Sequence, residues 1–226
     1  MDYQTLITNF PSLFSNRGAL IRIITDPIYI SNWREQKRNK LAAAGKPPHW
    51  ADIGIVLDDP YTFVIRDLVE FPDGRRGGYF RILNRADLQG GQGVVVLAEM
   101  NSKYLLLHLF RHPTRSWSYE VPRGFGEPGV LAEQQAKNEI EEEVGGEIEE
   151  LFDLGIYHSN TGLEGNKVKL FYAKLKSVGK PAKAEGIESL LWVSLAELEE
   201  MIANTKITDG FTIAAYTRAK LRGLLG

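Results

Sequence analysis

The chain has 226 residues, of which 43% are hydrophobic and 25% are charged, and its formal net charge is -2. This length can bury a sizeable core in one large domain, or in one domain with an appendage. The nearly balanced charge gives no general attraction to nucleic acid or to an anionic membrane. The absence of cysteine excludes disulfides, cysteine-ligated zinc and a thiol nucleophile. No leader-like start and no apolar run of membrane-spanning length is evident, so we expect a cytoplasmic protein.

The first sixty residues contain one clear secondary-structure signal, a helix predicted over residues 31–45. Ser31 or Asn32 can cap its N-terminus, and Gly45 follows its last turn. The two prolines that come next prevent the helix from continuing. Basic residues along it are more typical of a solvated surface than of a nucleic-acid binder.

Strand-forming sequences begin at residue 61. They are rich in β-branched and aromatic residues, and turn residues such as those of Pro72-Asp73-Gly74 separate them. The predicted strands cover residues 61–71, 77–84, 93–99, 104–111, 118–122, 147–159, 167–175 and 190–193.

One helix interrupts this series of strands and two helices follow it. The first is indicated by an apolar stripe with a period of four residues, and a Gly-Gly pair ends it. Ser194 and Glu197 form a capping box for the second, and a third is predicted near residues 211–224. The pattern predicts a single α+β core over residues 61–226, preceded by an N-terminal extension over residues 1–60.

Four carboxylates fall within five residues of the first of these helices. Glu139, Glu142 and Glu143 stand at i, i+3 and i+4 and share one face, whereas Glu141 points elsewhere. Like charges at this spacing destabilise an isolated helix by roughly 0.2–0.5 kcal/mol per pair. The run is therefore either a solvated acidic face or a site for a hard divalent cation, because carboxylate oxygens are the natural ligands of such ions. A glycine-rich loop before the helix favours the second reading, since it lets backbone approach a ligand closely.

The segment from residue 124 to 146 resembles the signature of the Nudix hydrolases. That signature reads Gly, five residues, Glu, seven residues, then Arg-Glu-apolar-x-Glu-Glu-x-Gly-apolar. The matching positions are Gly124, Glu139, Ile140, Glu142, Glu143 and Gly145.

Three positions depart from the signature. Its first Glu falls on Val130, its Arg falls on Asn138, and its last apolar residue falls on Gly146. In the family that Glu and Arg are thought to pair and to brace the loop against the helix. Both partners are replaced here, so neither charge is left unpaired, and we expect Asn138 to hydrogen-bond the loop backbone instead.

The resemblance implies a Nudix-type α/β/α sandwich with a mixed β-sheet and a hydrolase that depends on Mg²⁺ or Mn²⁺. By analogy, Glu139, Glu142, Glu143 and the backbone carbonyl of Arg123 would bind the metal. The ions would neutralise a bound diphosphate and activate a water that attacks phosphorus. Glu142 and Glu143 would thereby act in catalysis, and Gly124 would lie against the substrate.

Outside the signature, most of residues 61–224 is similar to the ADP-ribose and nucleoside-diphosphate-sugar pyrophosphatases. The similarity implies cleavage of a nucleotide sugar, foremost ADP-ribose to AMP and ribose 5-phosphate. Arg111 fits a position where that branch has an arginine near the substrate phosphates, and a guanidinium suits bidentate phosphate recognition. The alternative for Arg111 is a surface residue at a strand end.

The loop over residues 157–167 is where that branch carries a catalytic Glu. Glu164 lies two residues before the expected place, which Asn166 occupies, and Thr161 replaces the usual proline. A mobile glycine-rich loop can bring Glu164 in as general base; otherwise it is an ordinary exposed residue. His158 is a further candidate by its chemistry.

The resembling branch forms homodimers through N-terminal strands, with aromatic residues stacked on the adenine. Tyr29, Trp33 and Trp50 are candidates for such stacking or, alternatively, core residues. A rival reading for the whole chain is a Nudix-fold protein that binds a nucleotide and has lost turnover. A third reading is an interaction module whose acidic helix is an inert surface.

Overall fold

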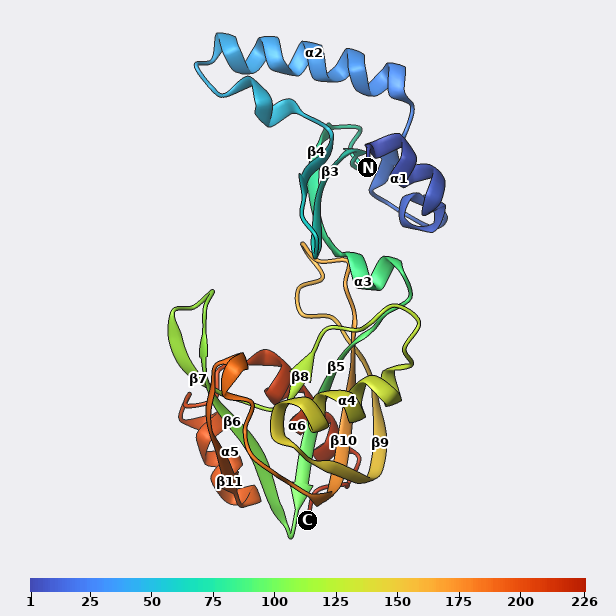
Figure 1. Cartoon of the computed structure of the whole chain (residues 1–226). Coiled ribbons are helices and arrows are strands. Elements are labelled where there is room, and N and C mark those ends of the chain that lie inside the picture. The colour runs from blue at the N-terminus through green and yellow to red at the C-terminus, as the bar shows by residue number, and fades with distance from the viewer. The chain divides into compact units, whose positions relative to one another are not determined.

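The computed structural model describes all residues 1–226 and divides the chain into two compact units (Figure 1). The first unit comprises residues 1–88 together with the loop 160–166, and the second comprises residues 89–159 and 167–226. The chain therefore passes between the units three times.

The first unit is built around a four-stranded antiparallel sheet. Strand β3 is central: it pairs with β4 along its whole length, and with β1 and β2 on its other edge. The elements are α1 (Tyr3–Asn9), a 3-10 helix (Pro11–Phe14), β1 (Arg22–Ile24), α2 (Pro27–Ala43), a 3-10 helix (Pro48–Ala51), β2 (Gly54–Asp58), β3 (Thr62–Glu70), β4 (Arg76–Asn84) and α3 (Arg85–Leu88).

Helix α2 begins earlier than the sequence predicted. Its N-cap is Asp26, whose Oδ1 accepts a hydrogen bond of 2.7 Å from the backbone N–H of Tyr29. Pro27 occupies the first helical position, where a missing N–H costs nothing and the fixed φ suits the helix. The prediction of Ser31 or Asn32 as the cap is therefore wrong, because the Asp-Pro pair that starts the helix lies five residues upstream of Ser31.

The boundary between the units lies at Leu88, whereas the sequence placed one after residue 60. The β3–β4 hairpin packs with the N-terminal helices in one apolar cluster, which contains Leu6, Phe14, Phe63, Ile65 and Leu83. A polar contact reinforces this packing. The buried carboxylate of Asp67 accepts hydrogen bonds from the Tyr3 hydroxyl at 2.6 Å and from Arg81.

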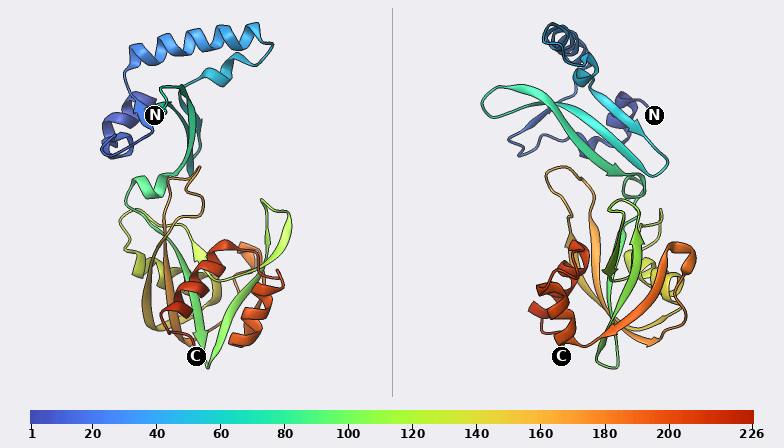
Figure 2. Two further views of the ribbon diagram at one scale, coloured as in Figure 1. Left: turned by 180° about the vertical axis from the view of Figure 1, so that it is seen from behind. Right: turned by 90° about the vertical axis from the view of Figure 1, so that its left-hand side faces the viewer.

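The second unit is a seven-stranded mixed sheet covered by helices on both faces (Figure 2). Strands β5 and β10 pair in parallel and the other pairings are antiparallel, in the order β11-β6-β5-β10-β9, with β7 on β6 and β8 on β5. The elements are β5 (Gly93–Met100), β6 (Lys103–Arg111), β7 (Ser116–Glu120), β8 (Arg123–Gly124), α4 (Ala132–Val144), β9 (Glu147–Tyr157), β10 (Val168–Ser177), a 3-10 helix (Lys183–Glu185), β11 (Ile187–Val193), α5 (Leu195–Ala203) and α6 (Gly210–Leu221).

Two apolar layers hold this sandwich together. Helix α4 buries Ala136, Ile140 and Val144 against one face of the sheet, as the four-residue stripe predicted. Helices α5 and α6 cover the other face. The α+β class, the α/β/α layering and the mixed sheet expected from the sequence are confirmed.

The predicted helix ends in this unit are also confirmed. Gly145 adopts φ 59° at the C-cap of α4, a left-handed conformation that favours glycine. At the start of α5, the Ser194 backbone N–H donates to Glu197 Oε2 at 2.7 Å, and Ser194 Oγ accepts from the Glu197 N–H at 3.3 Å. No helix in either unit has the length and apolar character that crossing a bilayer requires.

Candidate active site

The candidate site is a strand, loop and helix in the second unit. The two-residue strand β8 pairs Arg123 with Val95 and Gly124 with Val94 of β5. This pairing fixes the start of the glycine-rich loop, which then leads to α4 at Ala132. Backbone at residues 123–124 is therefore held against the same helix face that carries the carboxylates.

The structure buries two of the three predicted metal-binding carboxylates. Glu139 is 8% exposed and Glu143 is 5% exposed, whereas Glu142 is exposed to solvent. The i, i+4 pair thus faces the loop and sheet. Charged side chains this deeply buried normally have an opposite charge beside them, and neither Glu139 nor Glu143 forms an ion pair with Lys, Arg or His in this chain.

Glu139 is held by one hydrogen bond and one close approach. Its Oε1 accepts a hydrogen bond of 2.8 Å from Gln135 Nε2, one turn earlier on α4. Its carboxylate lies so close to Gly124 that a Cβ atom at residue 124 would overlap it. Glycine is therefore required at position 124 for the carboxylate to lie where it does.

Glu143 is bound by a backbone N–H and lies in surroundings that disfavour its negative charge. Its Oε2 accepts a hydrogen bond of 3.1 Å from the Arg123 N–H. Burial, together with the charge of Glu139, raises the pKa of Glu143 to about 8, although that hydrogen bond and the Arg111 charge act in the opposite direction. Burial likewise raises the pKa of Glu139. Both shifts report carboxylates in a site that favours the addition of positive charge.

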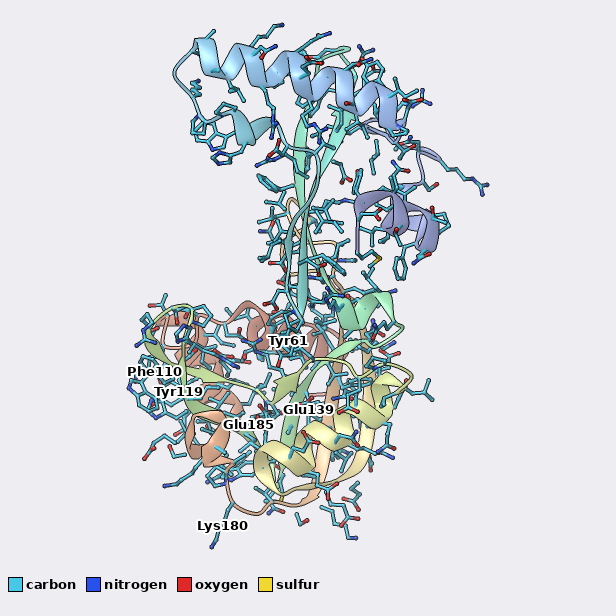
Figure 3. The ribbon with its side chains drawn as sticks, turned by 45° about the horizontal axis from the view of Figure 1, so that its top comes forward. Tyr61, Phe110, Tyr119, Glu139, Lys180 and Glu185 are labelled. Carbon is cyan, nitrogen blue, oxygen red and sulfur yellow. The ribbon has the colours of Figure 1, made fainter.

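Glu185 is a further negative charge that acts on this site, and the sequence does not predict its role. It ends the 3-10 helix before β11, and its negative charge contributes to the raised pKa of both Glu139 and Glu143. Figure 3 labels Glu139 and Glu185 on their separate elements of the second unit. No motif marks Glu185, because more than forty residues separate it from α4 and only the fold brings it close.

The donor set suits a hard divalent cation, although no ready-made cage is present. Nowhere in the chain do three His, Cys, Asp or Glu side chains converge as an ion site. Mg²⁺ commonly takes only one or two protein carboxylates and fills its other positions with water and substrate phosphate. Two buried carboxylates without a cationic partner fit that pattern.

Arg111 and Arg123 both bind the buried carboxylate of Glu120 at the end of β7. Arg111 donates to it at 2.6 Å and Arg123 at 2.9 Å. Arg111, predicted to contact phosphate, is thus not an isolated surface residue. The role of its guanidinium toward a ligand stays a prediction.

The loop carrying Glu164 is tied to strand β4 in the first unit. The Ile82 N–H donates to the Leu163 carbonyl at 2.9 Å, and the Gly165 N–H donates to the Ile82 carbonyl at 3.0 Å. Asn166 Oδ1 accepts from the Asn84 N–H at 2.6 Å. The expected free loop is therefore a hydrogen-bonded one, and Glu164 itself forms a parallel bridge with Ile82.

The replaced brace is rebuilt differently from our expectation. Asn138 Oδ1 accepts a hydrogen bond of 2.9 Å from Gln134 Nε2 within α4, rather than bonding the loop backbone. The loop closes on itself instead, with the Val130 N–H donating to the Glu127 carbonyl at 3.1 Å.

The three N-terminal aromatic candidates are not members of the first unit's core cluster. Trp50 is 53% exposed and Tyr29 is 37% exposed, and Arg76 lies over the Tyr29 ring at 5.2 Å. Trp33 is half-buried. The core reading is therefore wrong for Trp50 and Tyr29.

Comparisons with known proteins identify the family and the fold. Residues 88–211 match the family model described as the NUDIX domain. No curated protein sequence matches the chain. A solved structure described as an ADP compounds hydrolase superposes with a TM-score of 0.64 at 19% sequence identity, covering 75% of this chain and 92% of that one. At this identity the superposition demonstrates a shared fold, and the family model spans more than half of the sequence. The chain therefore belongs to the NUDIX domain family.

Proposed function

We propose that this protein is a metal-dependent pyrophosphatase that cleaves a nucleoside diphosphate linked to another moiety, foremost ADP-ribose or another nucleotide sugar. The observation that carries the proposal is the buried pair Glu139 and Glu143, two carboxylates with raised pKa and no cationic side chain paired to them. A diphosphate substrate accompanied by divalent cations supplies the missing charge. Hydrolysis to AMP and ribose 5-phosphate is the expected reaction on ADP-ribose.

In this proposal Glu139 and Glu143 hold the metal, with Glu142 and the Arg123 carbonyl as additional oxygen donors. The metal supplies charge that offsets the diphosphate and an activated water for attack on phosphorus. Gln135 positions Glu139 by donating to Oε1, which leaves Oε2 for the ion.

Three further residues act on the substrate or the water. The Arg111 guanidinium binds phosphate oxygens, and the absence of a side chain at Gly124 leaves room for Glu139 beside the diphosphate. Glu164 stays a candidate for the general base on the sequence resemblance alone, because its loop is hydrogen-bonded to β4.

The choice of substrate class rests on the sequence resemblance and on the name of one solved structure with the same fold, an ADP compounds hydrolase. A dependence on Mg²⁺ or Mn²⁺, a homodimeric state, a cytoplasmic location and the absence of a nucleic-acid or membrane partner remain predictions from the sequence.

The deciding experiment is product release from ADP-ribose, other nucleotide sugars, NADH and dinucleoside polyphosphates, with Mg²⁺ and then with Mn²⁺. AMP from ADP-ribose that ceases on addition of EDTA supports the proposal. Glu142→Gln and Glu143→Gln should each lower turnover. Glu141→Gln is the matched control, because Glu141 is exposed on the same helix turn and off the carboxylate face. Full activity in a folded Glu143→Gln variant would refute the metal assignment.

A second candidate is a nucleotide-binding protein of this family without turnover. Val130 and Asn138 favour it, because the charged brace of the signature is absent and Asn138 bonds only within its helix. Calorimetry that detects tight nucleotide binding, with no product from any substrate of the panel, would select this candidate.

A further inference from the structure

The β6–β7 hairpin places two arginines on one buried carboxylate. Strand register puts Leu107 opposite Glu120 and Arg111 opposite Ser116. Because side chains alternate between faces along a strand, Arg111 lies on the same face as Leu107 and Glu120. Leu107 belongs to the core layer beneath α4, so this face of the sheet is the one covered by the helix that carries Glu139 and Glu143.

Phe110 and Tyr119, labelled in Figure 3, are the hairpin neighbours of Arg111 and Glu120 and lie on the opposite face of the sheet.

Glu120 is shared between the two guanidinium groups. Its side chain is 3% exposed, and both of its oxygens accept from Arg111 Nε at 3.0 Å. Oε2 also accepts from Arg111 Nη2 at 2.6 Å and from Arg123 Nε and Nη2 at 3.0 and 2.9 Å. Glu120 therefore orients both arginines through these hydrogen bonds.

The Arg123 guanidinium contacts three side chains, those of Glu120, Phe211 and Asp209, and the Arg123 backbone joins this cluster to the buried carboxylates. Its guanidinium lies over the Phe211 ring at 4.9 Å, and its Nη2 is 3.8 Å from Asp209 Oδ1. The other oxygen of Asp209 is committed to the N-cap of α6 through the Thr212 N–H at 2.8 Å. Meanwhile the Arg123 backbone N–H contacts Glu143. One residue thus connects the paired arginines to the buried acidic pair.

Each guanidinium keeps one nitrogen available for a ligand. Arg111 and Arg123 use Nε and Nη2 toward Glu120, and Nη1 of each has no hydrogen-bond partner in the protein. Their side chains remain 29% and 27% exposed, so both nitrogens are reachable from solvent. Glu120 offsets one of the two guanidinium charges, and Asp209 Oδ1 lies 3.8 Å from Arg123 Nη2.

We propose that Arg111 and Arg123, oriented by Glu120, form a paired-guanidinium site that grips the diphosphate of the substrate. This inference rests on the proposed function, and it assigns the Arg123 side chain and Glu120 to substrate recognition. Planar guanidinium groups bind phosphoryl oxygens with defined geometry. Glu120 is a positioning residue. It does not touch the substrate, and it holds the two guanidinium groups so that the Nη1 atom of each can donate to the diphosphate.

Inorganic pyrophosphate in EDTA is the probe, and calorimetry measures its dissociation constant without metal or turnover. Arg111→Ala and Arg123→Ala should each weaken binding by about tenfold to a hundredfold, the effect of losing a charge-assisted hydrogen bond. Arg123→Lys should recover only part of the loss, because an ammonium cannot reproduce the fork. Arg115→Ala is the control, since Arg115 carries the same charge at the tip of the same hairpin, where its side chain contacts His112 and the Phe110 ring and not Glu120.

Glu120→Gln separates orientation from charge. If Glu120 acted through its charge alone, its neutralisation would strengthen pyrophosphate binding. If Glu120 positions the two arginines, Glu120→Gln should instead weaken pyrophosphate binding and raise the KM for substrate, with kcat nearly unchanged.

Wild-type protein that does not bind pyrophosphate, or an Arg123→Ala variant that binds it like wild type, would overturn the inference. Tighter binding by Glu120→Gln would overturn the positioning role. Failure of the proposed function has a different outcome: no substrate of the panel is cleaved, while pyrophosphate binding still depends on Arg111 and Arg123.

Discussion

The carboxylate of Glu139 lies against the Cα atom of Gly124, in space that any side chain at residue 124 would occupy. The two residues are fifteen positions apart, one on the short strand β8 and the other on α4. Their contact determines where the acidic face of the helix meets the glycine-rich loop. It also makes the first glycine of the signature a steric requirement for the position of Glu139.

Gly124→Ala should therefore displace Glu139 and lower kcat/KM by about a hundredfold, the usual cost of misplacing a catalytic group by about 1 Å. Steady-state kinetics at saturating Mg²⁺ measures the effect. Gly77→Ala is the control, because a Cβ there meets only an ordinary contact of 3.7 Å with Phe71. Unchanged kinetics in Gly124→Ala would show that the Glu139 position is not needed for activity.

Gln135→Met should weaken metal affinity by roughly tenfold to a hundredfold, as is typical when a group that orients a metal ligand is removed. The substitution keeps the volume and deletes the hydrogen bond to Glu139. It also deletes the buried Oε1 of Gln135, which has no hydrogen-bond partner. Because these two losses oppose each other, the free energy of unfolding should change little.

Titration of Mn²⁺ followed by its paramagnetic resonance signal measures the affinity directly. Gln134→Met is the control, since Gln134 neighbours Gln135 but bonds Asn138 on the exposed side of α4. Equal Mn²⁺ affinity in wild type and Gln135→Met would contradict the positioning role.

In EDTA, the melting temperature of the wild type should fall relative to that of Glu143→Gln as pH rises from about 4.5 to about 8. The ordinary pKa of Glu143 is 4.5 and its folded value is about 8. In this window the unfolded chain releases a proton that the folded chain retains, so a rise in pH favours unfolding. Thermal melts across the pH series measure the difference.

Addition of Mg²⁺ or Mn²⁺ should reverse this loss in the wild type at pH 8 and not in Glu143→Gln, because the ion binds the deprotonated carboxylate. Parallel melting curves for the two proteins at every pH would argue against a raised pKa at Glu143.

Glu185→Gln should lower the pKa of Glu139 and Glu143, because the negative charge of Glu185 helps to raise both. The pH-dependent loss of stability in EDTA should then become smaller. Metal affinity at pH 8 should also fall, since one attractive charge is removed. Glu188→Gln, a charge-matched change at an exposed residue of β11, should do neither. An unaltered pH profile in Glu185→Gln would place Glu185 outside the field of the site.

Much of the second unit follows from local sequence. β-Branched and aromatic content predicted its strands, the spacing of Ala136, Ile140 and Val144 predicted the buried face of α4, and Gly145 predicted where the helix ends. The first unit follows less from local sequence. Its helix α2 starts at an Asp-Pro cap upstream of the predicted one, and its strands β1 and β2 are short and become recognisable only through their pairing with β3.

The sequence by itself determined the family and the carboxylate face, because signature spacing and helical periodicity are local properties that one turn of backbone converts into position. Only the tertiary structure decided which of the three carboxylates are buried, that Glu185 belongs to their field, and that Arg111 and Arg123 meet on Glu120. These relationships depend on strand register and on segments that are distant along the chain. Burial and the pairing of charges across such segments are set by the packed fold, so no pattern within a short window contains them.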